Sequence, residues 1–504
     1  MAIQIDYAKT PFDAATLSQQ RHVLVLLEKS CIDLSSLDAL DHLGYADTLK
    51  RKLQRLAKPL DSLLKSPLQT ESATGCLISW VVIDPQATTF QTHSLLRKAI
   101  QPLLDEQAQE IALVINAEQT VVECMSMAAF YVAGVNAAVL PSRKSKAEAE
   151  KVLEKITLYP TAQSDKDWQQ ALAKPVKWTQ AVIEGNTLCR QLTMLPPNEL
   201  TPQHYRQRVK QMAQQHGWEW QEFDMQALRA MKAGAFVAVG QGSDPEDAAI
   251  VHVRYRPSLA QKTIALIGKG ICFDTGGHNL KPAKYMHGMH EDMNGSAVAL
   301  GTLLAATQAQ LPINLDVWLA IAQNHISPLA YKQNDVVTAL NGTTIEIMHT
   351  DAEGRMVLAD TLTLASRNQP DWMIDFATLT GSMVSALAER YSGVLSNRPE
   401  LAARAVSVGA AVGERLCTFP FDEDYDEELE SKLADIKQCT LDGGADHIHA
   451  ARFLSKFIEQ EVAWVHVDLS SYNHKGGLGA VSSDVNGFGV ALSMELLRRE
   501  LATS

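Results

Sequence analysis

Short apolar runs and longer stretches of helical period alternate through the first 165 residues of the chain. The runs at 22–28, 76–83 and 110–117 have the length of buried strands, and the segment 122–135 has the length of an apolar helix. Strands that alternate with helices in this way are typical of a sheet covered by helices. The pattern therefore predicts a small α/β domain at the N-terminus.

The pattern remains of the α/β type from residue 198 onward. A helix is expected from 201 to 217, because Thr201 suits the N-cap, Pro202 the first helical position and Gly217 the stop. Strand-like and helical runs follow in turn, at 235–242, 248–255, 263–268, 295–310 (helical), 315–322 and 372–380. This order predicts a mixed sheet flanked by helices, with functional groups at the carboxyl ends of its strands.

With 504 residues the chain is too long for one ordinary hydrophobic core, so two domains are expected. We place an N-terminal domain at 1–170, with an oligomerisation or regulatory role, and a larger domain at 171–504. The polar segment near 165–180 is predicted to be the linker between them.

The net charge of −13, from 45 Lys+Arg and 58 Asp+Glu, repels phosphate backbones and makes nucleic-acid binding unexpected. The basic stretch 49–65 is the one place where such binding would be sought. The best apolar runs have only strand length, so no membrane span is expected. The N-terminus lacks the pattern of a signal peptide, and the seven cysteines include no C-x-x-C pair. A cytoplasmic location is the prediction.

Two stretches carry the candidate chemistry. In "LIGKGICFDTGGHNLKPAKYMHGMHEDMNGSA", two lysines and two aspartates follow an apolar strand that is expected to end at Gly268; they are Lys269, Asp274, Lys281 and Asp292. In "HTDAEGRMVLAD", three charged residues alternate, and in an extended segment their side chains would all point to one side; they are Asp351, Glu353 and Arg355. The two stretches together supply four carboxylates.

Four carboxylates cannot share a poorly solvated cleft without cations, because their repulsion would cost several kcal/mol or force protonation. Two divalent metals about 3.5–4 Å apart are the usual remedy in hydrolases. A lysine in such a cluster can lose its proton in the field of the metals and become a nitrogen ligand. The second lysine and the arginine would stay cationic and face developing negative charge.

The chain closely resembles the leucyl aminopeptidase (cytosol aminopeptidase) family of dinuclear metallopeptidases. The resemblance runs from "NTLCRQLTMLPPNELTP" to near the C-terminus, through "GKGICFDTGGHNLKP", "MHGMHEDMNGSA", "TDAEGRMVLAD", "DFATLTGS", "GERL" and "ADIKQ". It implies a macro-like N-terminal domain and a mixed-sheet α/β/α catalytic domain of the zinc-exopeptidase type. It also implies a homohexamer, two divalent ions per subunit (zinc, manganese or magnesium) and a bicarbonate ion.

The resemblance implies an aminopeptidase that releases N-terminal, leucine-like residues from peptides through a water activated by two metals. The expected metal ligands are Lys269, Asp274, Asp292, Asp351 and Glu353. Lys281 would polarise the scissile carbonyl, and Arg355 would hold the bicarbonate as general base. The expected substrate-binding residues are Met289, Thr378, Leu379 and Gly381.

The chain departs from the family pattern at a few positions. His349 stands where asparagine is usual, His290 where lysine or arginine is common, and "GGADHIHAARFL" and "SSDVNGFGV" replace commoner small-residue versions. Three other hypotheses stay open. The first is a zinc site built from His287 and His290 with His278, or with His447 and His449. The second is a binding or regulatory protein that keeps the fold without catalysis or adds DNA binding to it, and the third is a two-metal hydrolase of phosphate esters.

Overall fold

The computed structural model describes residues 3–146, 153–159, 167–244 and 247–502 and divides the chain into two compact units. The first unit comprises the residues up to Ile183 together with the short segments Ala410–Gly413 and Lys475–Asp484. The second comprises Glu184–Gly409, Glu414–His474 and the residues from Val485 onward. Two segments from the C-terminal part of the sequence thus belong to the N-terminal unit, which the sequence pattern did not indicate.

The segment expected to be a linker is helical where the structure describes it. Helix α5 spans Trp168–Thr193, and the predicted boundary at 170/171 lies within its first turn. Trp168 and Leu172 are buried in the core of the first unit. Although the segment is mostly polar, burial of these apolar side chains on one face stabilises the helix.

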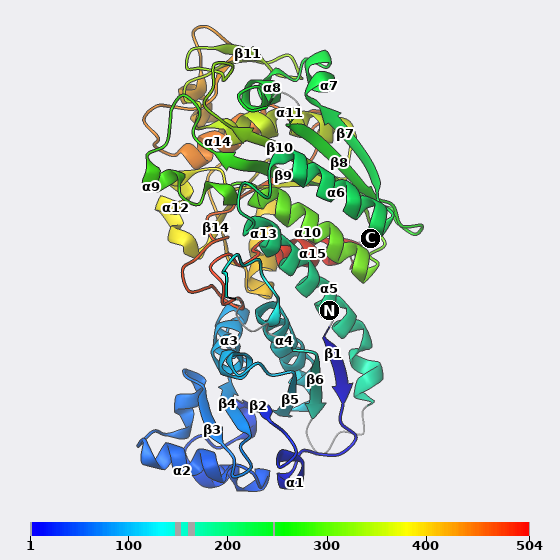
Figure 1. Cartoon of the computed structure of the whole chain (residues 1–504), viewed down its shortest axis with the longest axis vertical. Helices are drawn as coiled ribbons and strands as arrows, with labels where there is room; N and C mark the ends of the chain where they lie inside the picture. The colour runs from blue at the N-terminus through cyan, green and yellow to red at the C-terminus, as the bar shows by residue number, and fades with distance from the viewer. Residues whose placement is uncertain (1–2, 147–152, 160–166, 245–246, 503–504) are drawn as a thin grey trace. The chain divides into compact units, whose positions relative to one another are not determined.

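The N-terminal unit contains a six-stranded sheet in the order β1-β6-β5-β2-β4-β3 (Figure 1). Its pairs are parallel except β3 with β4. The strands are β1 (Gln4–Tyr7), β2 (His22–Glu28), β3 (Leu68–Glu71), β4 (Leu77–Ile83), β5 (Glu110–Asn116) and β6 (Lys155–Tyr159). The helices are α1 (Ala14–Leu17), α2 (Asp47–Arg55), α3 (Thr89–Asp105) and α4 (Gln119–Ala137), with α5 following. Alternate residues of β2 enter two different cores, so both faces of this sheet are covered.

Helix α4 corrects the expectation that no segment approaches the length of a membrane span. By length and composition Gln119–Ala137 is apolar enough to cross a membrane, but 61% of its apolar window is buried inside the structure. Its apolar side chains, such as Phe130 and Val132, belong to the core that also holds α3 and β5. The apolar character is therefore accounted for by packing within the unit.

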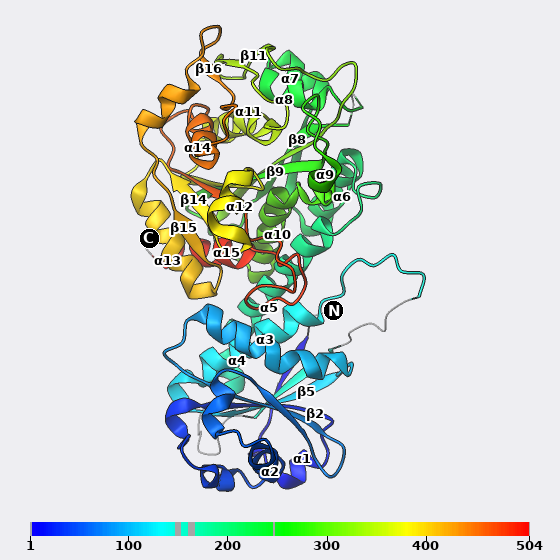
Figure 2. The ribbon, with the colours of Figure 1, turned by 90° about the vertical axis from the view of Figure 1, so that its left-hand side faces the viewer.

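The second unit is built on an eight-stranded sheet in the order β15-β14-β17-β13-β9-β10-β8-β7. Strands β15, β14, β9 and β8 of this sheet are labelled in Figure 2. The four central strands β17, β13, β9 and β10 are parallel to one another. The strands are β7 (Glu219–Asp224), β8 (Ala249–Tyr255), β9 (Thr263–Asp274), β10 (Asn314–Asn324), β13 (Trp372–Ala377), β14 (Ser392–Ser396), β15 (Leu416–Thr418) and β17 (Trp464–Asp468). A small separate sheet contains β11 (Val336–Thr338), β12 (Thr344–Glu346) and β16 (Ile436–Lys437).

Helices cover both faces of the large sheet, α6, α10 and α15 on one and α8, α11 and α14 on the other (Figure 1). The helices of this unit are α6 (Pro202–His216), α7 (Met225–Ala230), α8 (Gly234–Gly240), α9 (Ala283–Met286), α10 (Asn294–Ala309), α11 (Glu353–Arg367), α12 (Gly381–Leu387), α13 (Pro399–Val412), α14 (Asp446–Ser455) and α15 (Val490–Ala502). The predicted mixed α/β architecture is therefore confirmed, as is helix α6 with its cap Thr201 and stop Gly217.

Two local predictions were wrong. The run 235–242, expected to be a strand, contains helix α8, because a short apolar run has no period that separates a strand from a buried helix. The amide of Phe236 in the first turn of α8 donates to the carboxylate of Asp360, which satisfies a helix-end donor. Strand β9 does not end at Gly268 but continues to Asp274, paired with β10 across one shift of register between Ala322 and Asn324.

Candidate active site

The predicted site residues lie where the parallel central strands end. Strand β9 carries Lys269 and ends at Asp274, and Asp292 lies just before α10. Glu353 opens α11, which follows directly on the turn that holds Asp351. Five residues from two distant stretches of sequence are thereby brought to one edge of the sheet, as expected for an α/β enzyme.

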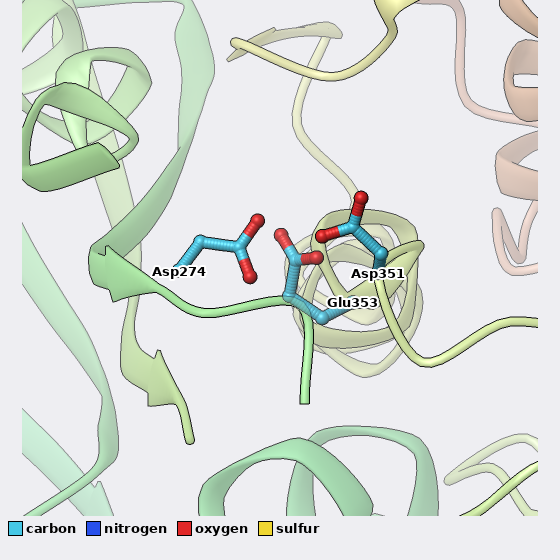
Figure 3. Close-up of side chains that lie close together, drawn as sticks. All are labelled: Asp274, Asp351 and Glu353. Atoms are coloured by element: carbon cyan, nitrogen blue, oxygen red, sulfur yellow. The ribbon is translucent and has the colours of Figure 1, made fainter. Parts of the chain in front are cut away.

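Three of the carboxylates form a compact group. Asp274, Asp351 and Glu353 each offer an oxygen, and these atoms all lie within 4.8 Å of one another (Figure 3). Asp274 and Glu353 are buried, and Asp351 is half-buried. Within the described ranges of the chain, this is the one group of three or more histidine, cysteine or acidic side chains with such spacing.

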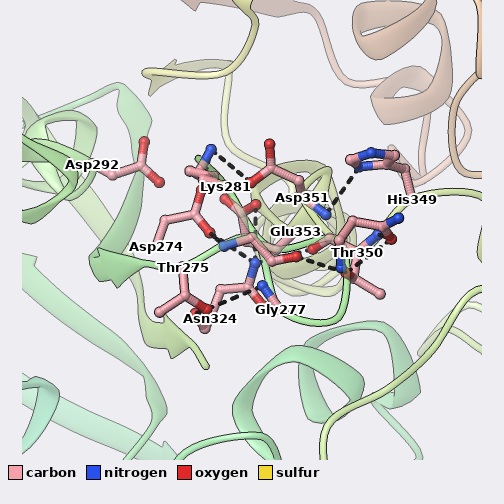
Figure 4. Close-up of polar contacts among 12 residues, drawn as sticks. Asp274, Thr275, Gly277, Lys281, Asp292, Asn324, His349, Thr350, Asp351 and Glu353 are labelled. Carbon is pink, nitrogen blue, oxygen red and sulfur yellow. Dashed lines mark hydrogen bonds and ion pairs between the residues drawn. The ribbon is translucent and has the colours of Figure 1, made fainter. Parts of the chain in front are cut away.

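Two lysines compensate these acids in the structure. Nζ of Lys269 lies 2.9 Å from Oε1 of Glu353 and 2.8 Å from Oδ2 of Asp292. Nζ of Lys281 lies 3.0 Å from Oδ2 of Asp274 and 2.6 Å from Oδ1 of Asp351 (Figure 4). Burial alone would lower the pKa of each lysine, but the surrounding carboxylates raise it, so both are ammonium groups in this arrangement.

The surroundings of these carboxyl groups disfavour their ionised form. Burial, followed by repulsion from the neighbouring carboxylates, raises the pKa of Asp351 to about 7. Burial also raises the pKa of Asp292 to about 8 and that of Glu353 above its usual range. Oδ2 of Asp292 and Oδ1 of Asp351 are buried and accept no hydrogen bond of good geometry; each only faces an ammonium group. Hard oxygen donors in this state fit divalent cations.

Packing against Lys269 explains why position 354, in "TDAEGR", is a glycine. A Cβ on Gly354 would lie 2.7 Å from Cε and 2.8 Å from Nζ of Lys269. The lysine therefore reaches Glu353 only because the start of α11 has no side chain at this position. Gly276 is similarly constrained: its φ is +86°, and a Cβ there would lie 2.9 Å from Oδ1 of Asp351.

Arg355 does not share a side with the two acids, which corrects the extended reading of "DAEGR". Glu353 and Arg355 both lie in α11, where residues two apart point about 200° away from each other. The buried guanidinium of Arg355 instead contacts Asp446, with one terminal nitrogen 2.8 Å from Oδ1 and 2.9 Å from Oδ2. The other terminal nitrogen donates to the carbonyl of Gln438 at 3.1 Å. The site expected for bicarbonate thus already holds a carboxylate of the chain, and the residues present do not fit the added ion.

Of the predicted substrate-binding residues, Thr378 contacts Asp292 directly. The hydroxyl of Thr378 donates to Oδ1 of Asp292 at 2.7 Å, and its carbonyl accepts from Lys269 at 2.9 Å. Gly381 opens α12 and is exposed, and no described atom outside its own helix and chain neighbours lies within 4 Å of the position of a Cβ. Met289 is half-buried in the short turn Met289–Glu291 that precedes Asp292.

Sequence reasoning missed two polar residues that hold this site. Asn324, the last residue of β10, donates to Oδ1 of Asp274 at 2.8 Å and to the carbonyl of Thr350 at 3.0 Å. Asp468, the last residue of β17, accepts from the hydroxyl of Thr380 at 2.6 Å and from the amide of Leu379 at 3.1 Å. The signal was available, since both are polar residues at the end of an apolar strand run.

No histidine in the described part of the chain belongs to the group of Asp274, Asp351 and Glu353. His349 lies beside it, accepting from the amide of Asp351 through Nδ1 at 3.3 Å (Figure 4). His447 on α14 contacts the hydroxyl of Ser382, and His449 packs against Tyr425. The separate histidine zinc site is not found among the residues that the structure describes. Cys272 is buried in β9 and packs as a small side chain.

The comparison with protein families decides the assignment. Residues 187–494 match the model of the cytosol aminopeptidase family, catalytic domain. The chain belongs to the cytosol aminopeptidase family. The resemblance read from the motifs is thereby confirmed, and with it the enzyme class, that of metal-dependent exopeptidases.

Curated relatives and solved structures agree with the family. The chain is 35% identical over 359 residues to a probable cytosol aminopeptidase of Corynebacterium glutamicum, covering 71% of this chain and 70% of the relative. It is 40% identical over 330 residues to a probable cytosol aminopeptidase of Stutzerimonas stutzeri, covering 65% of each. These matches therefore span about two thirds of the relatives' length.

Two solved structures are similar over nearly the whole chain. A mutant of tomato leucine aminopeptidase matches with a TM-score of 0.84 and 25% identity, covering 99% of this chain and 97% of that one. The bottromycin maturation enzyme BotP in complex with manganese matches with a TM-score of 0.80 and 27% identity, covering 95% and 99%. The α/β fold is thus shared with the structure of a leucine aminopeptidase and with that of BotP.

Proposed function

We propose that the chain is an aminopeptidase that releases N-terminal, leucine-like residues from peptides. The observation that carries the proposal is the convergence of two lysines and four carboxylates, from separate stretches, at the carboxyl ends of the parallel central strands of a mixed sheet. Family membership supports the reaction class.

The proposed metal ligands are Lys269, Asp274, Asp292, Asp351 and Glu353. When bound there, two divalent ions (zinc, manganese or magnesium) would polarise a carbonyl and activate water at neutral pH. The donor set supports this, because carboxylates with raised pKa values and oxygens without a hydrogen bond favour a cation. To act as a ligand, Lys269 would have to release its proton and its contacts with Glu353 and Asp292.

Lys281 is proposed to polarise the scissile carbonyl. Its ammonium is partly exposed, with 15% of the side chain open to solvent, whereas that of Lys269 is 3% exposed. A cation at the edge of the cluster can face the negative charge that develops on a carbonyl oxygen. Leu379 is proposed to hold the peptide through its carbonyl, since its amide already donates to Asp468. Bicarbonate forms no part of this proposal.

Hydrolysis of leucine p-nitroanilide tests the proposal, with the N-acetylated compound as the matched control. We expect release of p-nitroaniline only from the free amine, loss of activity after chelation, and recovery on addition of Mn²⁺ or Zn²⁺. Equal rates on the two compounds would exclude an aminopeptidase. Cleavage of p-nitrophenyl phosphate, with no cleavage of leucine p-nitroanilide or its N-acetylated form, would favour a two-metal phosphate esterase.

Assembly and location are part of the same proposal. We propose a homohexamer, supported by the family resemblance. We also propose a location in the cytoplasm, supported by the names of the curated relatives and by the seven cysteines, all of which are free thiols. Analytical ultracentrifugation tests the assembly: a mass near six times 55.2 kDa is expected, and a monomer would exclude it.

A further inference from the structure

The guanidinium of Arg355 and the carboxylate of Asp446 form a closed pair. Arg355 is buried, with 2% of its side chain exposed, and both carboxylate oxygens lie within 2.9 Å of one of its terminal nitrogens. Its other terminal nitrogen donates to the carbonyl of Gln438. Charge-assisted contacts of this length are strong in a buried setting.

A second feature holds Asp446 in place. It is the first residue of α14, where the exposed amides of a helix start favour a negative charge. The preceding Ala445 adopts a left-handed backbone with φ of 51°. The carboxylate is thus stabilised by a helix start as well as by a guanidinium.

The pair is tied to the acidic group through Gln438. The carbonyl of Gln438 accepts from Arg355, its Nε2 donates to the carbonyl of Ala352 at 2.9 Å, and its Oε1 accepts from the amide of His349 at 3.2 Å. Ala352 lies between two of the proposed metal ligands, so the pair is one hydrogen-bonded residue away from the metal-binding turn.

Two departures from the family pattern meet here. His349 contacts Gln438 through its backbone amide, which a residue of any other type would also supply. Asp446, in the segment "GGADHIHAARFL", contacts Arg355, which in turn donates to Gln438. A small residue at position 446 would leave the guanidinium open to an outside anion. With Asp446 present, a second anion would meet a neutralised guanidinium and a like charge a few ångströms away.

We infer that Asp446 takes the place of bicarbonate as the resident anion of Arg355, so that hydrolysis by this chain does not depend on dissolved bicarbonate. The inference rests on the proposed function of the same site. The Nε–H of Arg355 is buried without a hydrogen-bond partner. This one remaining donor cannot form the two parallel hydrogen bonds through which a guanidinium binds a planar anion.

The test compares the metal-loaded full chain with its Asp446→Gly and Asp446→Ser variants, in carbonate-free buffer and after addition of sodium bicarbonate. The wild type is expected to change less than about 2-fold between the two conditions. Each variant is expected to be about 10²-fold slower without bicarbonate and to recover at least about 10-fold with it. Sodium chloride at equal ionic strength controls for salt.

Asp426→Asn is the matched control variant. Asp426 also pairs through both of its oxygens with a buried guanidinium, that of Arg452 in α14, at 2.7 Å from Nε and 2.7 Å from one terminal nitrogen. Its loss should change the rate in both buffers equally. A bicarbonate-specific recovery in this variant would show that any broken ion pair on α14 produces the effect, and would overturn the inference.

Direct binding supplies a readout other than activity. Thermal unfolding of the metal-loaded protein should shift upward with bicarbonate in Asp446→Gly and not in the wild type, because a ligand raises the melting temperature only if the folded state binds it. Stimulation or stabilisation of the wild type by bicarbonate would overturn the inference, as would variants that neither recover nor bind. If the wild type cleaves no aminoacyl substrate, the proposed function fails, whereas the binding measurement still decides between Asp446 and bicarbonate.

Discussion

The side-chain amide of Asn324 donates a 2.8 Å hydrogen bond to Oδ1 of Asp274, where strands β10 and β9 end side by side. A polar neighbour of this kind orients a metal ligand, and its loss typically costs 10–100-fold in metal affinity or activity. We expect Asn324→Ala to reduce either quantity by about 10–100-fold. Metal titration of the variant measures the effect.

Asn314→Ala is the control for that change, because Asn314 lies at the opposite end of the same strand and contacts only Thr263 among the described side-chain bonds. It should leave metal affinity unchanged. An Asn324→Ala protein with normal affinity and turnover would remove Asn324 from the site.

Lys281 is predicted to affect turnover more than metal binding. Removing a donor that faces developing negative charge usually costs about 10²–10³-fold in kcat, so Lys281→Ala should lose that much. Elemental analysis should find the metal content retained. Lys284→Ala is a matched control, since Lys284 is exposed on the neighbouring short helix α9. A fully active Lys281→Ala protein would contradict the assigned role.

Asp468 is predicted to position the loop that follows β13. Its buried carboxylate accepts from Thr380 and Leu379, and burial raises its pKa. Asp468→Ala leaves these donors without a partner, which should lower the free energy of unfolding by about 1–3 kcal/mol. The KM for leucine p-nitroanilide should rise more than kcat falls, because the loop carries the expected substrate contacts. An unchanged KM would contradict this role.

Asp360 makes stability depend on pH. Burial raises the pKa of this carboxyl to about 6, although the amides of Leu340 and Phe236 donate to it and Arg367 contributes a positive charge. Since the unfolded pKa is about 3.9, the native state binds this proton more tightly, and its stability falls as pH rises from about 4 to about 6. The loss amounts to about 3 kcal/mol.

Urea unfolding of the wild type and of Asp360→Asn across this range checks the sign. The wild type should lose stability relative to the variant as pH rises through the window, since the amide does not ionise. Parallel curves for the two proteins, or a relative gain by the wild type, would contradict the raised pKa.

The sequence predicted the participants of the site better than their local geometry. The acids and lysines of both motifs converge as expected, because the carboxyl ends of parallel strands meet at one edge. The alternation of Asp351, Glu353 and Arg355 was read as extended, but α11 begins at Glu353 and turns Arg355 away. Asp351, Glu353 and Arg355 at this spacing are compatible with an extended segment and with the start of a helix. Only packing against the sheet determines which of the two forms.

The remaining features depend on contacts between distant segments. Neither motif predicts that Arg355 pairs with Asp446, or that Asn324 donates a hydrogen bond to Asp274. Likewise α8 forms where a strand was expected, since its short apolar run packs on α11 and gains a hydrogen bond to Asp360. Local propensity carries no information about such long-range partners.

Calorimetric titration of the chelated full chain with Mn²⁺, alongside its Glu353→Gln variant, tests the central claim most directly. The wild type should bind two ions per chain and regain aminopeptidase activity as they bind, while the variant, which keeps the shape of the side chain but loses its charge, should bind fewer and stay inactive. A chelated wild type that is still fully active, or a variant that binds both ions and turns over normally, would contradict the account.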